Sequence, residues 1–184
     1  MNPRSLGTLC VIGGTAYLMN GLRFFIAGAP VEDSLSGVLS GVWALGALCG
    51  VLGMIAVQAT GANRVIRSIS YLPVVAFALV LAGIASMLAN PVDAFSPLIA
   101  FGLLGVVIGM LLNGAFTLHA PVWTGWKKAV PFLPAIMPFV GMALGNLIGV
   151  EGGVNVSLVA LSWMVLGYAV ITSPVTAEAR AAAV

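Results

Sequence analysis

The sequence contains very little charge. Only 7% of its 184 residues are Asp, Glu, Lys or Arg, whereas a water-soluble domain averages about 25%. This excludes an ordinary soluble domain, and the hydrophobic fraction of 61% excludes a disordered chain, because disorder needs low hydrophobicity and high net charge. The net charge of +2 is too small and too dispersed for nucleic-acid binding, which needs a basic face.

The residues that catalysis and metal binding require are also scarce. The sequence has 1 histidine and 2 cysteines, and it contains no H-E-x-x-H, C-x-x-C, G-x-S-x-G or P-loop pattern. Cys10 and Cys49 lie inside apolar runs, which is typical of small buried side chains rather than of a disulfide. No Asp or Glu lies inside an apolar segment. We therefore expect no catalytic site, no metal site and no cofactor.

Long apolar segments make up nearly the whole chain. Six segments are each long enough to cross roughly 30 Å of hydrocarbon. They lie at about 5–29, 35–60, 65–90, 95–119, 130–149 and 154–173, with turn formers and charged residues between them. We expect an all-α polytopic membrane protein, a single domain built as a bundle of six transmembrane helices.

The charged residues sort between the two faces of the membrane. The N-terminus, the second and fourth loops and the C-terminus hold Arg4, Arg64, Arg67, Lys127, Lys128 and Arg180, whereas the other loops hold Glu32, Asp33, Asp93 and Glu151. The positive-inside rule assigns the basic face to the cytoplasm. We expect a multi-pass protein of the bacterial inner membrane with both termini in the cytoplasm.

The first segment has an alternative interpretation as a signal peptide. A basic start, an apolar run and the small residues Ala27-Gly28-Ala29 resemble such a peptide and its cleavage site. Pro30 would directly follow the cut, however, and Asn20 and Arg23 interrupt the apolar region. We therefore expect a retained span.

Three loops resemble one another weakly. Pro30-Val31-Glu32, Pro91-Val92-Asp93 and Gly149-Val150-Glu151 recur at a spacing of about 60 residues. The pattern leaves open two architectures: three tandem helical hairpins, or a bundle without internal repetition.

Glycines at four-residue spacing mark two helices as packing elements. They are Gly37, Gly41, Gly46 and Gly50 in the second segment, and Gly141, Gly145 and Gly149 in the fifth. This spacing places glycines on one helix face and lets another backbone approach closely. The face could pack within the chain, or it could contact other membrane subunits or a second copy.

Three prolines begin the fifth segment. Pro131, Pro134 and Pro138 each lack a backbone donor and disturb the preceding turn. The stretch is either a simple helix entry, where proline is tolerated, or a broken helix of the kind that lines transporter sites.

A group of polar residues interrupts the first apolar segment. Tyr17, Asn20 and Arg23 follow at three-residue spacing and share one side of a helix. A charge at this depth usually faces the bundle and pairs, and the candidate partners are Glu32, Asp33 and Glu151, with Asn146 at a similar level. The group is either a salt bridge that orients the first hairpin, or a polar vestibule for a small polar or anionic solute.

The fourth loop is basic and aromatic. Trp123, Trp126, Lys127 and Lys128 lie close together there, and such residues anchor proteins at the headgroups of anionic lipids. We expect these side chains to contact membrane lipids.

Two short motifs carry a resemblance to known proteins. Gly125-Trp126-Lys127-Lys128 before a proline-bearing helix, and Trp163-Met164-Val165-Leu166-Gly167-Tyr168 in the last segment, resemble a loose group of small six-span bacterial membrane proteins with no known activity. This resemblance implies a six-helix fold. Asn20-Gly21 and the three-hairpin plan are similar to the six-span amide and urea channels, which implies solute permeation by analogy.

Together these observations predict a non-catalytic integral membrane protein. We expect an accessory or scaffold subunit that packs through glycine-rich helix faces, with membrane lipids and other membrane subunits or further copies as partners. The alternative is a channel or transporter for a small neutral or anionic solute.

Overall fold

The computed structural model describes residues 2–27, 33–89 and 97–173, and within these ranges all regular structure is helical. The elements are α1 (Pro3–Ala27), α2 (Ser34–Ala56), α3 (Arg64–Ser70), α4 (Leu72–Ala89), α5 (Pro97–His119), the 3-10 helix η1 (Gly125–Ala129), α6 (Phe132–Ile148) and α7 (Glu151–Ile171). The expected all-α bundle is confirmed.

Most of these helices are long and apolar enough to cross a membrane. Five segments of the described chain meet both conditions: α1, α2, the stretch Arg64–Ala89, α5 and Gly152–Ile171. The apolar helix α6 is shorter, with 17 residues. This set of helices indicates a multi-pass membrane protein.

The third predicted segment, 65–90, is not one continuous helix. It divides at Tyr71 into α3 and α4. Pro73, the second residue of α4, has no N–H to donate to Ile69, and its ring clashes with the turn before it. Hydropathy alone does not reveal this break, because the apolar run continues through it.

The second predicted segment, 35–60, also ends earlier than expected. Helix α2 stops at Ala56, and Gln58 adopts a left-handed conformation with φ 56°. The N–H of Gln58 donates to the Ile55 carbonyl at 3.0 Å, and that of Ala59 donates to the Met54 carbonyl at 3.1 Å. These two bonds satisfy carbonyls left free at the helix end, the arrangement of a Schellman motif.

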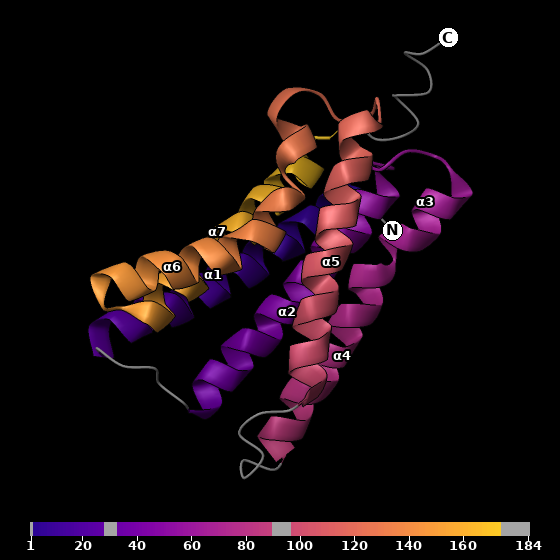
Figure 1. Ribbon diagram of the computed structural model, residues 1–184. Coiled ribbons are helices and arrows are strands. Elements are labelled where there is room, and N and C mark those ends of the chain that lie inside the picture. The colour runs from indigo at the N-terminus through magenta and orange to yellow at the C-terminus, as the bar shows by residue number, and fades with distance from the viewer. Residues whose placement is uncertain (1, 28–32, 90–96, 174–184) are drawn as a thin grey trace.

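Figure 1 shows the helices in two groups that diverge from each other. Helix α1 packs against both α7 and α2, α6 packs on α7, and α4 packs on α5 and α2. The group α1, α6 and α7 therefore meets the group α2, α4 and α5 mainly where α1 contacts α2. Helices α5 and α6 lie together near η1 and separate away from it (Figure 1).

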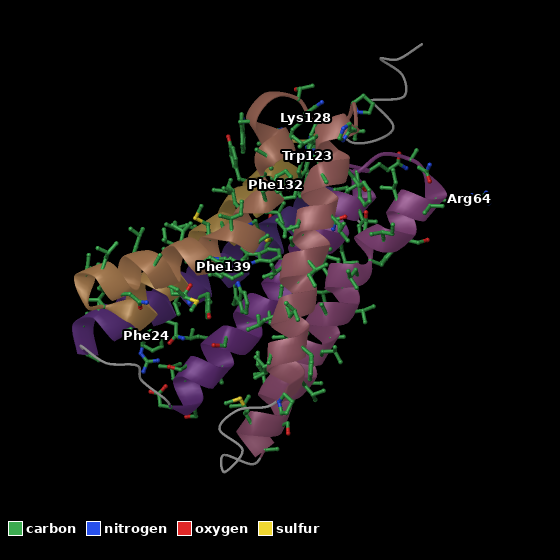
Figure 2. The ribbon with its side chains drawn as sticks, viewed as in Figure 1. Phe24, Arg64, Trp123, Lys128, Phe132 and Phe139 are labelled. Carbon is green, nitrogen blue, oxygen red and sulfur yellow. The ribbon has the colours of Figure 1, made fainter. Side chains whose placement is uncertain are left out.

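The two ends of the bundle differ in charge. The end that carries η1, here called the basic end, holds Arg4, Arg64, Arg67, Lys127 and Lys128. Figure 2 shows Arg64 and Lys128 toward this end and Phe24 toward the opposite one. Asp33 and the first residue of α7 lie at that opposite end, whereas Glu32, Asp93 and Arg180 fall outside the described residues.

Candidate functional site

Arg23 is paired with an acidic residue at the start of α2. Its Nη2 lies 2.6 Å from Oδ2 of Asp33, and its Nη1 donates to the hydroxyl of Ser36 at 3.3 Å. The Ser36 hydroxyl in turn donates to Oδ1 of Asn20 at 3.0 Å. This network joins the end of α1 to the beginning of α2.

Asp33 has two roles in this network. Its Oδ1 accepts a hydrogen bond from the Ser36 backbone N–H at 2.7 Å, so it also caps the N-terminus of α2. The Arg23 side chain, followed by the Ser36 N–H, lowers the pKa of the Asp33 carboxyl from 3.8 to about 2. The carboxylate is therefore charged at neutral pH, and the geometry is that of an ion pair orienting the first hairpin.

The other residues expected in a polar vestibule are Tyr17, Asn146 and Glu151. Tyr17 stacks on Trp43 of α2, with ring centroids 4.5 Å apart. Asn146 is exposed in the last turn of α6. Glu151 begins α7, but its side chain lies outside the described part of the chain. Of the predicted vestibule residues, Asn20 and Arg23 thus meet, through Ser36.

A different feature occupies the space between the two helix groups. A cavity of about 320 Å³ opens between α5, α6 and α7, and residues of α1 and α2 form its floor. Its lining residues are Tyr17, Trp43, Leu103, Leu104, Val106, Val107, Pro134, Pro138, Phe139, Asn155, Val159 and Trp163. We call it the wedge cavity, because it lies where α5 and α6 diverge (Figure 1).

The contact between α5 and α6 explains where the wedge cavity begins. Nearer the basic end, the ring of Phe132 fills the space beside Gly114, so that a Cβ on Gly114 would lie 2.8 Å from that ring. Farther along α6, Phe139 lines the cavity instead (Figure 2). The helices therefore touch through a glycine at one level and separate at the next.

Aromatic rings form the floor of the wedge cavity and continue into the core. Tyr17 stacks on Trp43, whose ring meets Phe77 edge-on at 5.9 Å between centroids, and Phe77 meets Trp163 in the same manner at 5.3 Å. Phe77 and Trp163 are buried almost completely. Such edge-to-face pairs stabilise a defined ring arrangement, so packing fixes the rings of Trp43 and Trp163 where they line the cavity.

Two polar atoms in lining residues of the cavity lack hydrogen-bond partners. Within the described part of the chain, nothing pairs with the buried Nε1 of Trp43 or the buried Oδ1 of Asn155. In addition, Pro138 cannot donate to the carbonyl of Pro134, and both prolines line the cavity. Unpaired polar groups are costly inside a membrane, so two residues that line the cavity each carry an unsatisfied polar atom that the neighbouring side chains cover.

The three prolines of the fifth segment, which suggested either a helix entry or a broken helix, occupy different positions in α6. Pro131 precedes α6, and Pro134 falls in its first turn, where the missing N–H costs nothing. Pro138 lies inside the helix. Helix entry thus accounts for the first two, whereas Pro138 leaves a carbonyl without its helical partner beside a cavity.

The predicted packing glycines mostly contact other helices of the same chain. In α2, a Cβ added to Gly37 would lie 2.9 Å from Leu88, and one added to Gly41 would lie 3.8 Å from Ile84, both in α4. A Cβ on Gly46 would lie 2.7 Å from the Cα of Gly13, and one on Gly50 would lie 2.5 Å from the sulfur of Cys10, both in α1. In α6, a Cβ on Gly141 would lie 2.6 Å from the Cα of Asn155 in α7. Gly145 is buried in α6. These faces are therefore used for packing within the chain.

Gly149 has a different role from the one expected. It has φ 72° and ends α6 in the left-handed conformation, and among the described residues, its two chain neighbours aside, no atom lies within 4 Å of the place that a Cβ would occupy. Glycine is favoured there because the left-handed region is sterically costly for other residues. Gly149 is thus a helix stop and not a packing residue.

A second set of glycines, not expected from the sequence, joins α1 to α7. Gly14 of α1 faces Ala160 of α7, and a Cβ on Gly14 would lie 3.1 Å from the Ala160 carbonyl oxygen. Gly21 faces Gly153, and a Cβ on Gly21 would lie 3.2 Å from the Gly153 carbonyl oxygen. Gly7 lies opposite Gly167 in the same register. The seven-residue spacing of small residues on both helices is visible in the sequence and could have predicted this pairing.

The basic loop is partly buried. Trp123 is 1% exposed, and its indole N–H donates to the hydroxyl of Ser173 at 2.7 Å. The prediction that Trp123 contacts lipid headgroups is therefore wrong, because the side chain is buried. A buried indole needs a hydrogen-bond acceptor, and Ser173 supplies it. Trp126, in contrast, is 53% exposed and stacks on Tyr168.

Both lysines of this loop bond to the ends of helices. Lys127 Nζ donates to the Thr172 carbonyl at 2.8 Å, and Lys128 Nζ donates to the Leu118 carbonyl at 3.0 Å. Burial lowers the pKa of Lys127. A cation at a helix C-terminus interacts favourably with the helix dipole, so these lysines fasten the loop to α7 and α5.

Comparisons with known proteins supply no family for this chain. No protein-family model, no curated protein and no solved structure matches it. Among the described residues, no three His, Cys, Asp or Glu side chains come together where they could hold a metal ion. The function is therefore inferred from the wedge cavity and its surroundings.

Proposed function

We propose that this chain is a non-catalytic integral membrane protein that takes up a small amphiphilic molecule from the bilayer into the wedge cavity. The observation that carries the proposal is the pair of buried polar atoms without partners, Trp43 Nε1 and Asn155 Oδ1, in residues that line an otherwise apolar space. A ligand that displaces the side chains covering these atoms meets an indole N–H that donates to an oxygen and an amide oxygen that accepts from a hydroxyl.

The surroundings of the cavity favour a ligand that comes from the lipid phase. Phe139 is 61% exposed and Leu104 is 56% exposed on the two helices that border its opening. In a bilayer these side chains face hydrocarbon. A volume of about 320 Å³ lies at the lower end of the range of roughly 300–1,000 Å³ for small-molecule sites, so the ligand is smaller than a whole phospholipid.

The proposal places the protein in the bacterial inner membrane with six spans and both termini in the cytoplasm. Helix α6 is the fifth span along the chain and brings the number of spans to six: its 17 residues extend about 25 Å at 1.5 Å per residue, and the Pro131 turn lengthens the segment at one end. The basic end faces the cytoplasm by the positive-inside rule. Labelling of single cysteines introduced in 121–131 and at Gly149 from opposite sides of the membrane tests this topology.

Calorimetric titration of the purified protein in detergent tests ligand binding, with empty micelles subtracted. The probes are 1-naphthol, whose hydroxyl can both donate and accept, and naphthalene, which has the same rings and no polar group. We expect 1-naphthol to bind about tenfold more tightly, the difference that one net hydrogen bond supplies.

Three variants locate the binding. Trp43→Phe keeps the ring stacking and removes the N–H, and Asn155→Leu removes the amide at similar size; each should reduce the preference for 1-naphthol. Val107→Phe should block both probes by filling the cavity. Trp126→Phe, outside the cavity, serves as the control. Equal affinity for the two probes in the original chain, or unchanged binding in Val107→Phe, would refute the proposal.

The role of an accessory subunit has weaker support than ligand binding. The glycine faces that suggested it contact other helices of the same chain, as Gly46 contacts Gly13. Native mass spectrometry of protein extracted in mild detergent tests this role, since stoichiometric foreign subunits would support it. Solute permeation through an Arg23 vestibule is likewise weakened, because Arg23 is paired with Asp33.

A further inference from the structure

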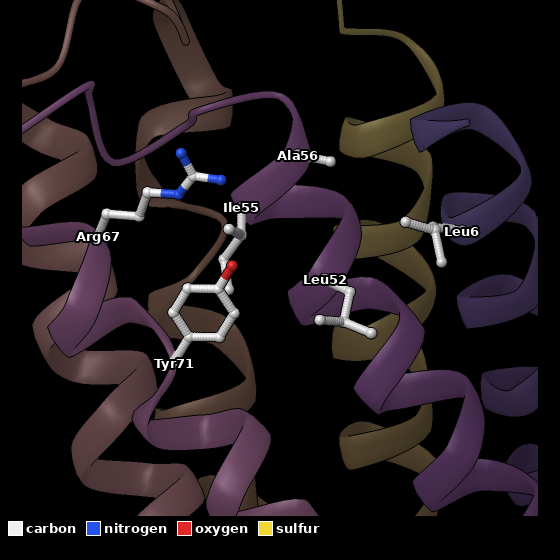
Figure 3. Close-up of a pocket in the computed structure, with 6 residues that line it drawn as sticks. All are labelled: Leu6, Leu52, Ile55, Ala56, Arg67 and Tyr71. Atoms are coloured by element: carbon white, nitrogen blue, oxygen red, sulfur yellow. The ribbon is translucent and has the colours of Figure 1, made fainter. Parts of the chain in front are cut away.

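A second cavity lies at the basic end, on the side of α2 that faces α3. It has a volume of about 180 Å³ and is lined by Leu6 of α1, by Leu52, Ile55 and Ala56 of α2, and by Arg67 and Tyr71. Figure 3 shows the Arg67 and Tyr71 side chains extending toward α2, with Leu52 and Leu6 beyond. We call this feature the basic cleft. It is separate from the wedge cavity and shares no lining residue with it.

The polar side of the basic cleft comes from one helix face. Arg67 and Tyr71 are four residues apart at the end of α3, a spacing that places two side chains on the same side. Within the described ranges, no carboxylate pairs with the Arg67 guanidinium. An exposed guanidinium and a phenol hydroxyl thus lie together beside apolar walls, and both can donate hydrogen bonds.

The other cations of the basic end differ from Arg67. Lys127 and Lys128 donate to the carbonyls of Thr172 and Leu118 at helix ends. Arg4 at the start of α1 and Arg64 one turn earlier on α3 are both exposed, and neither lines the cleft. Arg67 therefore combines a charge that no described carboxylate neutralises with an apolar cavity.

We propose that the basic cleft binds one anionic phospholipid. The guanidinium of Arg67 donates to the phosphate in the fork geometry that suits this group, and the Tyr71 hydroxyl donates a further hydrogen bond. The first carbons of an acyl chain lie against Leu52 and Leu6. Charge complementarity selects an anionic headgroup, and the apolar walls select a lipid rather than a soluble phosphate.

Native mass spectrometry of the detergent-purified chain tests this site. The protein is mixed with palmitoyl-oleoyl phosphatidylglycerol or with phosphatidylcholine carrying the same acyl chains, and the bound fraction is measured against lipid concentration. Both lipids offer a phosphate to Arg67, but the quaternary ammonium of phosphatidylcholine cancels its charge, so we expect the original chain to prefer phosphatidylglycerol by about tenfold. Arg67→Gln should abolish this preference, Tyr71→Phe should reduce it, and Arg67→Lys should retain part of it.

Arg64→Gln is the matched control, because it removes the same charge from the same helix outside the cleft. It should change the preference less than about twofold. Leu52→Trp fills the cleft with the charge intact and should also reduce binding, so the test does not depend on Arg67 variants alone. Melting temperatures without lipid establish that each variant is folded.

Two kinds of result would overturn the proposal. If Arg64→Gln lowers the preference as much as Arg67→Gln, or if the original chain binds both lipids equally, the cleft does not recognise the headgroup. If glycerol phosphate displaces phosphatidylglycerol completely, the site binds free phosphate esters and not lipid.

Discussion

Gly7 of α1 and Gly167 of α7 lie so close together that a Cβ on either one would be 2.7 Å from the carbonyl oxygen of the other. Real Cβ atoms do not approach a backbone atom this closely. The antiparallel contact of α1 with α7 therefore requires the absence of a side chain at both positions, in a setting where close backbone approach drives helix association.

Replacement of Gly167 tests this contact. Gly167→Ala should destabilise the protein by about 1–3 kcal/mol, because the added methyl group must push the two backbones apart. Gly41→Ala is the control, since its Cβ would lie an ordinary 3.8 Å from Ile84, and alanine favours helix over glycine by up to about 1 kcal/mol. Thermal unfolding in detergent measures both. Equal melting temperatures for the two variants would contradict the close α1–α7 contact.

The Arg23–Asp33 pair predicts a dependence of stability on pH. The pKa of Asp33 is lowered from 3.8 to about 2, so its contribution is fully present above pH 3.8 and is lost as the pH falls toward 2. Asp33→Asn keeps an N-capping side chain and removes the charge. We expect the variant to melt below the original chain at pH 6, and the difference to shrink between pH 4 and pH 2. A constant difference across this range would show that the ion pair contributes nothing.

Gln58 is the residue at which glycine should improve the fold. Its φ of 56° places it in the left-handed region at the end of α2, where a side chain costs roughly 1–2 kcal/mol. Gln58→Gly should therefore raise the melting temperature or leave it unchanged, whereas the β-branched Gln58→Val should lower it. The reverse order would mean that the Gln58 side chain supports the turn.

The bond between Trp123 and Ser173 predicts which residues of the basic loop matter for stability. Ser173→Ala leaves the buried indole N–H of Trp123 without its acceptor and should cost about 1–3 kcal/mol. Trp126→Phe should change the free energy of unfolding by less than about 0.5 kcal/mol, as is usual for exposed positions. Chemical denaturation followed by circular dichroism distinguishes the two. A larger effect at Trp126 would show that its stacking on Tyr168 holds the loop in place.

The helices were easier to predict from the sequence than the site. Apolar segments of about 20 residues predict helices, because a helix satisfies all its backbone hydrogen bonds within one segment in lipid, whereas a barrel strand is about half as long. The bounds of the third segment agree with the structure, but local chemistry overrode hydropathy inside it, where the helix breaks before Pro73, and in the second segment, where the helix ends before Gln58. A sequence-level signal existed for the α1–α7 contact, the seven-residue spacing of Gly7, Gly14 and Gly21.

The sequence predicted the ion pair of Arg23 but not the wedge cavity. Arg23 had to find a partner because an unpaired charge at that depth is costly, and Asp33 was among the candidates that the sequence offered. No pattern in the sequence indicated the wedge cavity. Asn155, Trp43 and Phe139 lie far apart along the chain and carry no shared motif.

The sequence by itself thus determined that the chain is helical and apolar, that basic residues gather at one end, and that Arg23 needs a counter-charge. These properties follow from local composition and from solvation in lipid. The tertiary structure alone decided where α5 and α6 separate. Gly114 admits the Phe132 ring at one level, and the helices diverge beyond it. A cavity is created by the angle between helices, which depends on side-chain contacts between segments remote in sequence.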